Sequence, residues 1–212
     1  MKDTTKQILE ELVIRYPQLS VAKNDILNAY LLLENAYKNG NKLLICGNGG
    51  SAADSEHIIG ELMKKFKKER PIKQDIYNEL NKYGDEGRIL QETLDGCLRA
   101  TSLTSHISLS TAFANDKEPT AAFAQQLYGL GDAGDILLSI STSGNSENCV
   151  LAATLAKAMN IKTISLTGKM DSKLSRISDV TIKAPETETY KVQELHLPIY
   201  HALCAMLEEE FF

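Results

Sequence analysis

A histidine and a carboxylate stand four residues apart in the stretch "SAADSEHIIGEL", as His57 and Glu61. On a helix, side chains at this spacing lie on the same face. An imidazole and a carboxylate on one face can share a divalent metal ion, although an ordinary surface ion pair has the same spacing. A carboxylate near a carbonyl group, with a metal ion or an imidazole opposite, is also suited to moving a proton between neighbouring carbon atoms.

A second polar pair, Gln193 and His201, falls in an expected last helix over residues 188–209. Eight residues separate the two, which is about 12 Å along a helix axis. One metal ion held by both would therefore require a bend in the helix or a neighbouring chain. Taken alone, Gln193 is typical of an exposed helix position, and His201, next to Tyr200, of a histidine in a protein core.

Two loops have the composition of anion-binding turns, and the first of them is "CGNGGSA", residues 46–52. Its glycines fit the G-x-G-x-x-[GA] pattern of dinucleotide sites, and Ser51 stands where a helix should begin. Dinucleotide sites also need an acidic residue at the tip of a second strand about 20 residues further on, and no such strand follows on schedule. The turn therefore favours a smaller anion over a nicotinamide cofactor.

The second loop, "STSGNS" at residues 141–146, carries four hydroxyls where an expected strand meets a helix. Hydroxyls and free amides at a helix start can bind a phosphate monoester without lysine. A serine-rich turn that merely caps its own helix has the same composition. Because both loops would follow parallel strands, they would face the same crevice of an α/β sheet, and together they favour a small phosphorylated ligand.

Short apolar segments alternate with helical ones along most of the chain, which is typical of α/β proteins with a parallel sheet covered on both faces. Residues 67–98 are polar and long for a connection; we expect two short helices there, around Gly84 and Gly87, and favour a surface excursion over a lid or a subunit contact. The expected strands are 42–46, 99–103, 135–140, 161–166 and 179–183; the expected helices are two within 3–39, then 51–66, 117–128, 146–159, 171–177 and 188–209.

The composition argues against several classes of protein. The 212 residues have a formal charge of −5, which predicts no nucleic-acid partner, and no apolar run is long enough for a membrane span. We expect no signal peptide, because the first residues are charged. The four cysteines are far apart in sequence and form no C-x-x-C motif, which argues for reduced thiols and a cytoplasmic protein.

The stretches "CGNGGSAADSEH", "SISTSGNS" and "KVQELHLPIYH" together resemble the phosphoheptose isomerases of the sugar isomerase (SIS) superfamily. The resemblance implies a three-layer α-β-α sandwich around a central five-stranded parallel sheet. It also implies a division into an N-terminal helical segment that makes oligomer contacts, residues 1–40, and a SIS sugar-phosphate-binding domain, residues 41–212. Residues 67–98 are an extra segment that shorter members of the family lack.

The resemblance implies conversion of sedoheptulose 7-phosphate to D-glycero-D-manno-heptose 7-phosphate through an enediol, as a step of heptose biosynthesis. Glu61 would be the base that transfers the proton, and His201 the acid that acts at the substrate oxygens. A zinc ion would polarise those oxygens and would be held by His57, Glu61, Gln193 and His201. Glu61 cannot be both a firmly held ligand and a free base, so one of those roles must weaken.

The family pattern also implies a set of substrate-binding residues. Asp54 matches a family aspartate, although an acid in the first turn of a helix is equally common without a function. Tyr190 occupies a position that is commonly acidic in the family, a change that would reshape the sugar end of the pocket. The implied contacts to phosphate or sugar hydroxyls are Asn48, Gly49, Gly50, Ser51, Asn115, Asp116, Ser141, Thr142, Ser143, Ser146 and Gln193.

A homotetramer with active sites at the subunit seams is expected, from the family and from a wide apolar stripe over residues 20–39. Two other functions stay open. One is a non-catalytic SIS-domain regulator that binds a sugar phosphate, and the other is an isomerase of a different sugar phosphate. The presence of the full set of histidines, glutamate and glutamine favours the heptose isomerase over both.

Overall fold

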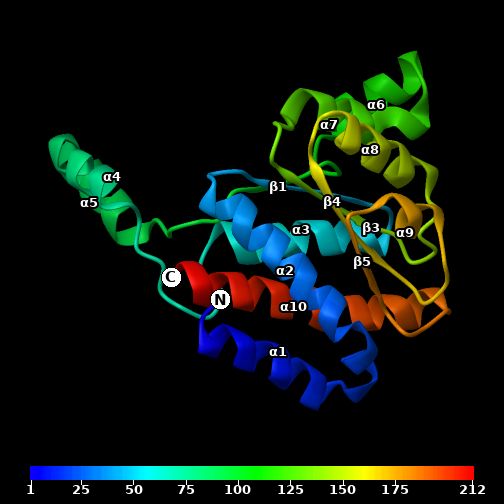
Figure 1. Ribbon diagram of the computed structural model, residues 1–212. Coiled ribbons are helices and arrows are strands. Elements are labelled where there is room, and N and C mark those ends of the chain that lie inside the picture. The colour runs from blue at the N-terminus through cyan, green and yellow to red at the C-terminus, as the bar shows by residue number, and fades with distance from the viewer.

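A parallel sheet of five strands lies at the centre of the computed structural model, which describes residues 1–212 (Figure 1). The strands follow the order β2-β1-β3-β4-β5, and every neighbouring pair is parallel. β1 and β3 are buried along their whole length because helices cover both faces of the sheet. The strands are β1 (Leu43–Gly47), β2 (Ala100–Ser102), β3 (Ile136–Ile140), β4 (Lys162–Thr167) and β5 (Val180–Lys183).

Helices form a layer on each face of the sheet, so the expected three-layer sandwich is confirmed (Figure 1). The larger core lies on one face, under α1 (Asp3–Arg15), α2 (Lys23–Lys38), α3 (Gly50–Met63) and α10 (Thr189–Phe211). The smaller core lies on the other face, where α7 (Ala122–Leu130), α8 (Glu147–Ala158) and α9 (Lys173–Ile177) pack. The remaining elements are the 3-10 turns η1 (Pro17–Ala22), η2 (Asn81–Tyr83) and η3 (Pro119–Ala121), and the helices α4 (Gln74–Leu80), α5 (Gly84–Thr93) and α6 (Ile107–Asp116).

The wide apolar stripe of α2 is largely covered within a single chain. Ile26, Tyr30 and Leu33 are buried, because α2 lies between the sheet and α10. Leu31 stays 42% exposed. The width of the stripe is therefore explained by packing inside one chain, and it does not by itself require a second one.

The extra segment forms a helical hairpin, α4 and α5, that extends away from the body of the protein (Figure 1). The two expected short helices are confirmed, and no side chain of α4 is buried. The two ends of the hairpin lie together, since the Gly96 amide donates to the Arg70 carbonyl over 2.6 Å. The hairpin is thus an excursion from one point of the fold.

Arg70 anchors the base of this hairpin to the end of α3. Its guanidinium is buried, pairs with Glu208 over 2.7 Å, and donates to the carbonyls of Glu61 and Leu62. These carbonyls lie in the last turn of α3, where a helix leaves acceptors without partners. Arg70 therefore satisfies the end of the helix that carries Glu61.

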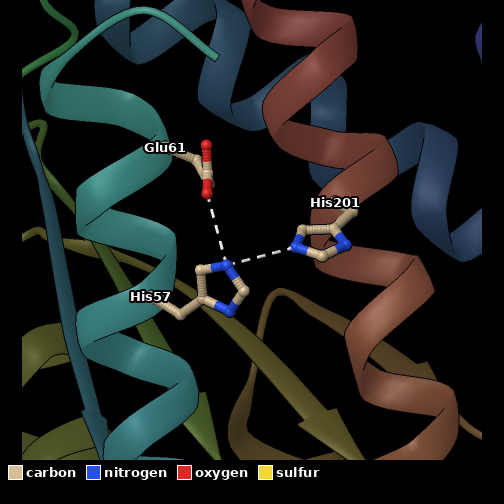
Figure 2. A group of neighbouring side chains, drawn as sticks. All are labelled: His57, Glu61 and His201. Atoms are coloured by element: carbon tan, nitrogen blue, oxygen red, sulfur yellow. Dashed lines mark hydrogen bonds and ion pairs between the residues drawn. The ribbon is translucent and has the colours of Figure 1, made fainter. Parts of the chain in front are cut away.

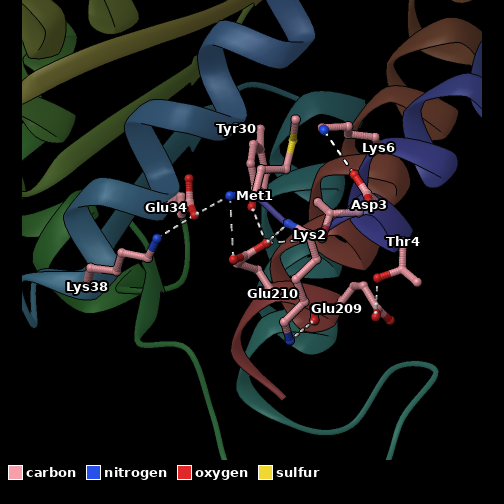
Figure 3. A network of polar contacts seen from close by, with 11 residues as sticks. Met1, Lys2, Asp3, Thr4, Lys6, Tyr30, Glu34, Lys38, Glu209 and Glu210 are labelled. Carbon is pink, nitrogen blue, oxygen red and sulfur yellow. Dashed lines mark hydrogen bonds and ion pairs between the residues drawn. The ribbon is translucent and has the colours of Figure 1, made fainter.

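The two ends of the chain are tied together by polar contacts, shown in Figure 3. Glu210 accepts a hydrogen bond from the backbone amide of Lys2 over 2.9 Å and from the hydroxyl of Tyr30 over 3.1 Å. The terminal amine of Met1 lies 3.6 Å from Glu34 and 3.8 Å from Glu210. These contacts hold α1 against α10.

Three expected elements differ from the structure. The helix expected over 51–66 ends at Met63, and the strand expected over 99–103 is reduced to Ala100–Ser102. The helix expected over 117–128 is displaced, because Pro119 opens a 3-10 turn and α7 follows it, while α6 over Ile107–Asp116 was not expected. None of the helices has both the length and the apolar character that crossing a lipid bilayer demands.

Candidate active site

The two predicted anion-binding loops meet at the carboxyl ends of the neighbouring strands β1 and β3. Gly47, the last residue of β1, pairs with Ile140, the last residue of β3, so the loops that follow start side by side. They enclose a cavity of about 340 Å³. Its lining consists of Asn48, Gly49, Gly50, Ser51, Ile140, Ser141, Thr142, Ser146, Thr189 and Gln193. The structure therefore brings together eight of the predicted substrate-binding residues.

Helices α3 and α8 both begin at this cavity without a side-chain cap. Gly49 precedes α3 with φ of 54°, a left-handed conformation that glycine adopts without strain. Ser146 precedes α8, and its hydroxyl bonds to Ser141 Oγ over 2.9 Å instead of to a helix amide. At the start of α3 the amides of Ser51 and Ala52 already donate to the carbonyls of Asn48 and Gly49, and in α8 the amide of Cys149 donates to Asn148 Oδ1. What the two helix starts offer the cavity is chiefly their partial positive charge and the hydroxyls of the loops. The cavity is thus suited to an anion, as the sequence predicts.

Two asparagines join the first loop to the first turn of α8. The side-chain amides of Asn48 and Asn148 exchange hydrogen bonds of 2.9 Å and 2.8 Å. The predicted contact of Asn48 with sugar hydroxyls would have to share this amide. Asn148 was not singled out from the sequence, because an asparagine in the first turn of a helix is ordinary there. Ser143 is exposed, and its hydroxyl accepts from the Asn145 amide.

Helices α3 and α10 run side by side in the same direction away from the cavity. At their beginning, a Cβ added to Gly50 would lie 2.5 Å from Nε2 of Gln193. About two turns further on, His57 of α3 meets His201 of α10. Gln193 therefore lines the loop cavity, as predicted for substrate binding, and its place among the metal ligands stays a prediction.

His57, Glu61 and His201 form a compact group of possible metal ligands (Figure 2). His57 Nε2 lies 3.3 Å from Glu61 Oε1 and 3.4 Å from His201 Nε2, and one donor atom from each residue lies within 4.8 Å of the others. No partner chain is needed to assemble these three. His201 also lines a separate cavity of about 230 Å³ between α1 and α10.

Burial shapes the electrostatics of this group. Partial burial lowers the pKa of His201, His57 lowers it further, and Glu61 acts in the opposite direction. The imidazole of His201 is therefore kept in its neutral form, which can bind a metal ion or exchange a proton with a substrate oxygen. Burial also raises the pKa of Asp54, against the effect of a hydrogen bond from Tyr200 and the proximity of His57.

Tyr200 connects two helices behind the histidines. Its hydroxyl lies 3.1 Å from Nδ1 of His57 and 3.2 Å from Oδ1 of Asp54. In the sequence, Tyr200 stands out only as a neighbour of His201. Its role could not be read from spacing, because contact with α3 depends on how α10 packs.

Three predicted residues lie outside the loop cavity. Asn115 and Asp116 end α6 in exposed positions, where the Asn115 amide donates to Asp116 over 2.9 Å. Ser143 is exposed on its loop, as described above. Tyr190 is 57% exposed in the first turn of α10, beside the cavity residue Thr189. The substrate contacts predicted for Asn115, Asp116 and Ser143 stay predictions.

Comparison with known proteins places the chain in a family. The SIS domain family model matches residues 100–208, and a second SIS domain model matches residues 18–86. The phosphoheptose isomerase of Akkermansia muciniphila is 34% identical over 93% of this chain and 91% of its own length. The phosphoheptose isomerase of a Nitratiruptor species is 38% identical over 88% of this chain and 86% of its own length.

A solved structure agrees with these sequence matches. The phosphoheptose isomerase of Neisseria gonorrhoeae superposes with a TM-score of 0.71 and 30% identity, covering 97% of this chain and 92% of that one. The residues matched by the two family models include both anion-binding loops and His201. The chain therefore belongs to the SIS-domain family and, within it, to the phosphoheptose isomerases.

Proposed function

We propose that this protein is an aldose-ketose isomerase that converts sedoheptulose 7-phosphate to D-glycero-D-manno-heptose 7-phosphate. The observation that carries the proposal is the pairing of an anion cavity with the His57–Glu61–His201 group on the same two helices. Membership among the phosphoheptose isomerases supports the substrate class.

The distance between the two parts suits a long sugar. Gly50 and His57 differ by seven residues along α3, and Gln193 and His201 by eight along α10. These separations correspond to about 10 to 12 Å along the helix axes. An extended seven-carbon chain with a terminal phosphate spans about 10 Å, given C–C bonds of about 1.5 Å. The phosphate would thus occupy the loop cavity while C1 and C2 reach the histidines.

In the reaction, Glu61 takes a proton from C1 of the open-chain ketose and returns it to C2. The electron pair of the broken C1–H bond forms the C1–C2 double bond of an enediolate, while the carbonyl oxygen at C2 gains the charge. His201 passes a proton between O1 and O2, so that the product carries an aldehyde at C1 and a hydroxyl at C2. The carbon skeleton and the phosphate are unchanged, and no external oxidant is needed.

The donor group fits a zinc ion. A tetrahedral zinc with ligands at about 2.0 to 2.1 Å has ligand atoms about 3.4 Å apart. The separations of 3.3 Å and 3.4 Å from His57 Nε2 to its two neighbours match that spacing. Zinc would be held chiefly by His57 and His201, with Gln193 or substrate completing the set and Glu61 bound only weakly so that it can act as the base; the ion would supply Lewis acidity at the substrate oxygens.

The proposed assembly is a homotetramer in the cytoplasm with active sites at the subunit seams. Family membership supports the assembly. The three donor residues already meet within one chain. A second chain would therefore contribute to the walls of the site rather than to this donor group.

The test is turnover of sedoheptulose 7-phosphate by the wild type and by Glu61→Gln, each after chelation with and without added zinc. We expect zinc-dependent aldoheptose formation in the wild type and its loss in the variant, which keeps the size of the side chain. A wild type that binds the sugar phosphate but never converts it with any divalent metal would instead indicate a non-catalytic binding protein. Conversion of a different sugar phosphate at a much higher kcat/KM would reassign the substrate.

A further inference from the structure

Tyr200 and Asp54 form a chain of polar contacts that ends on the inner nitrogen of His57. The Tyr200 hydroxyl lies 3.2 Å from Asp54 Oδ1 and 3.1 Å from His57 Nδ1. The outer nitrogen of the same ring, Nε2, faces Glu61 and His201. The contacts of Nδ1 thus determine whether Nε2 carries a proton or a free lone pair.

The direction of these hydrogen bonds follows from the number of protons available. A tyrosine hydroxyl has one proton, and an ionised carboxylate can only accept. When Tyr200 donates to Asp54, its oxygen can only accept from His57, so Nδ1 of that ring must carry its proton. Nε2 is then left with a free lone pair.

We propose that Tyr200, oriented by Asp54, is a positioning residue that holds His57 in the Nδ1–H tautomer and so directs the lone pair of Nε2 at the metal group. This inference rests on the proposed function only where it concerns metal binding, because the tautomer of His57 is set without metal or substrate. Histidines that bind metals generally donate their other N–H to a fixed acceptor, and loss of that acceptor typically weakens metal binding by about 10- to 100-fold.

Two groups around Nε2 act in opposite directions on this tautomer. Nε2 of His57 lies 3.3 Å from Glu61 Oε1, which as a carboxylate oxygen is an acceptor. Without a cation this contact taken alone favours the Nε2–H tautomer, so the chain of Tyr200 and Asp54 on Nδ1 has to outweigh it. His201 can meanwhile donate its own Nε2 proton to His57 across 3.4 Å in the metal-free protein. The Nδ1–H tautomer thus leaves a donor set that a cation completes.

The first test reads the tautomer directly in metal-free protein labelled with ¹⁵N in the histidine rings. Long-range ¹H–¹⁵N spectra distinguish a protonated Nδ1 from a protonated Nε2, and the four rings are assigned from single His→Gln variants. We expect the Nδ1–H form for His57 in the wild type. In Tyr200→Phe and in Asp54→Ala we expect a shift toward the Nε2–H form, because the acceptor is lost or the hydroxyl turns to donate to Nδ1.

The second test measures Co²⁺ affinity by its visible absorption, with no substrate present. Tyr200→Phe should bind Co²⁺ about 10- to 100-fold more weakly than the wild type. The matched control is Tyr30→Phe, because Tyr30 is equally buried and its hydroxyl also bonds to a carboxylate, Glu210, far from this group. The control should leave Co²⁺ affinity unchanged.

The outcomes separate this proposal from the proposed function. An Nε2–H tautomer of His57 in the wild type would overturn the positioning role, whatever the protein catalyses. Unchanged tautomer and unchanged Co²⁺ affinity in Tyr200→Phe would also overturn it, even if turnover fell. An Nδ1–H wild type that shifts in both variants would support the role of Tyr200, even in a protein that isomerises no heptose.

Discussion

Nε2 of His57 and Nε2 of His201 lie 3.4 Å apart, although 143 residues of sequence stand between the two histidines. Parallel packing of α3 and α10 creates this pairing, and the same packing sets Gln193 against Gly50 at the anion cavity. Pro198 lies within α10 between these two levels. A proline there removes one backbone hydrogen bond of the helix.

Replacing His201 with glutamine should weaken zinc binding by more than about 100-fold, since loss of a direct ligand exceeds the effect of losing an outer contact. Isothermal titration of the chelated protein with zinc measures this change. His106→Gln is the matched control, because His106 is exposed at the start of α6. Equal zinc affinity in both variants would remove His201 from the metal group.

Gly50→Ala should raise the KM for the sugar phosphate by about tenfold, the effect of losing one hydrogen bond to a charged group. The new Cβ would lie 2.5 Å from the Gln193 amide and displace that flexible side chain from the cavity. Steady-state kinetics and competition by inorganic phosphate measure the change. Gly60→Ala is the control in the same helix, where an added Cβ meets nothing within 4 Å. That control should keep the KM and gain about 0.5 to 1 kcal/mol of stability.

Stability should fall as the pH drops from 7 toward 4, in part because of His196. Burial lowers the pKa of this histidine from 6.5 to about 4, while its Nε2–H donates to the Thr167 carbonyl over 3.2 Å. Between these pKa values the unfolded chain binds a proton that the native chain does not, so the free energy of unfolding rises with pH. Because of this histidine, the free energy of unfolding should be about 2 kcal/mol lower at pH 5 than at pH 7.

The matched experiment for this pH effect is urea unfolding of the wild type and of His196→Gln at pH 7 and pH 5. Glutamine can donate to the same carbonyl but does not titrate, so all other titrating groups cancel in the comparison. The difference in unfolding free energy between the two proteins should change by about 2 kcal/mol between the two pH values. An identical difference at both would show that His196 titrates normally.

Replacing residues 73–93 with two glycines should leave the body of the fold intact, because the hairpin of α4 and α5 extends from one point. Gly96 and Arg70 are already joined by a hydrogen bond at its base. We expect a melting temperature within a few degrees of the wild type and unchanged turnover, measured by calorimetry and kinetics. Light scattering of the same variant reports the assembly. A loss of assembly would show that the hairpin is a subunit contact, and a loss of turnover alone would make it a lid.

Much of the fold could be predicted from the sequence because its signals are local. Five short apolar runs separated by helical segments indicated the parallel sheet, and glycines followed by Ser51 located the start of α3. The unexpected helix α6 has a different cause. Its sequence, "ISLSTAFAND", contains β-branched and small polar residues with weak helix propensity, and it carries no buried residue to mark a periodic face.

The sequence by itself determined which chemical groups the protein has and in what local setting: the i,i+4 pair of His57 and Glu61, and two loops of glycines and hydroxyls at helix starts. Only the tertiary structure decided which groups meet. His201 joins that pair, and Tyr200 bridges Asp54 and His57, because α10 packs parallel to α3. Spacing along a chain fixes neighbours within one helix, whereas contacts between helices depend on the direction, register and rotation that the whole core imposes.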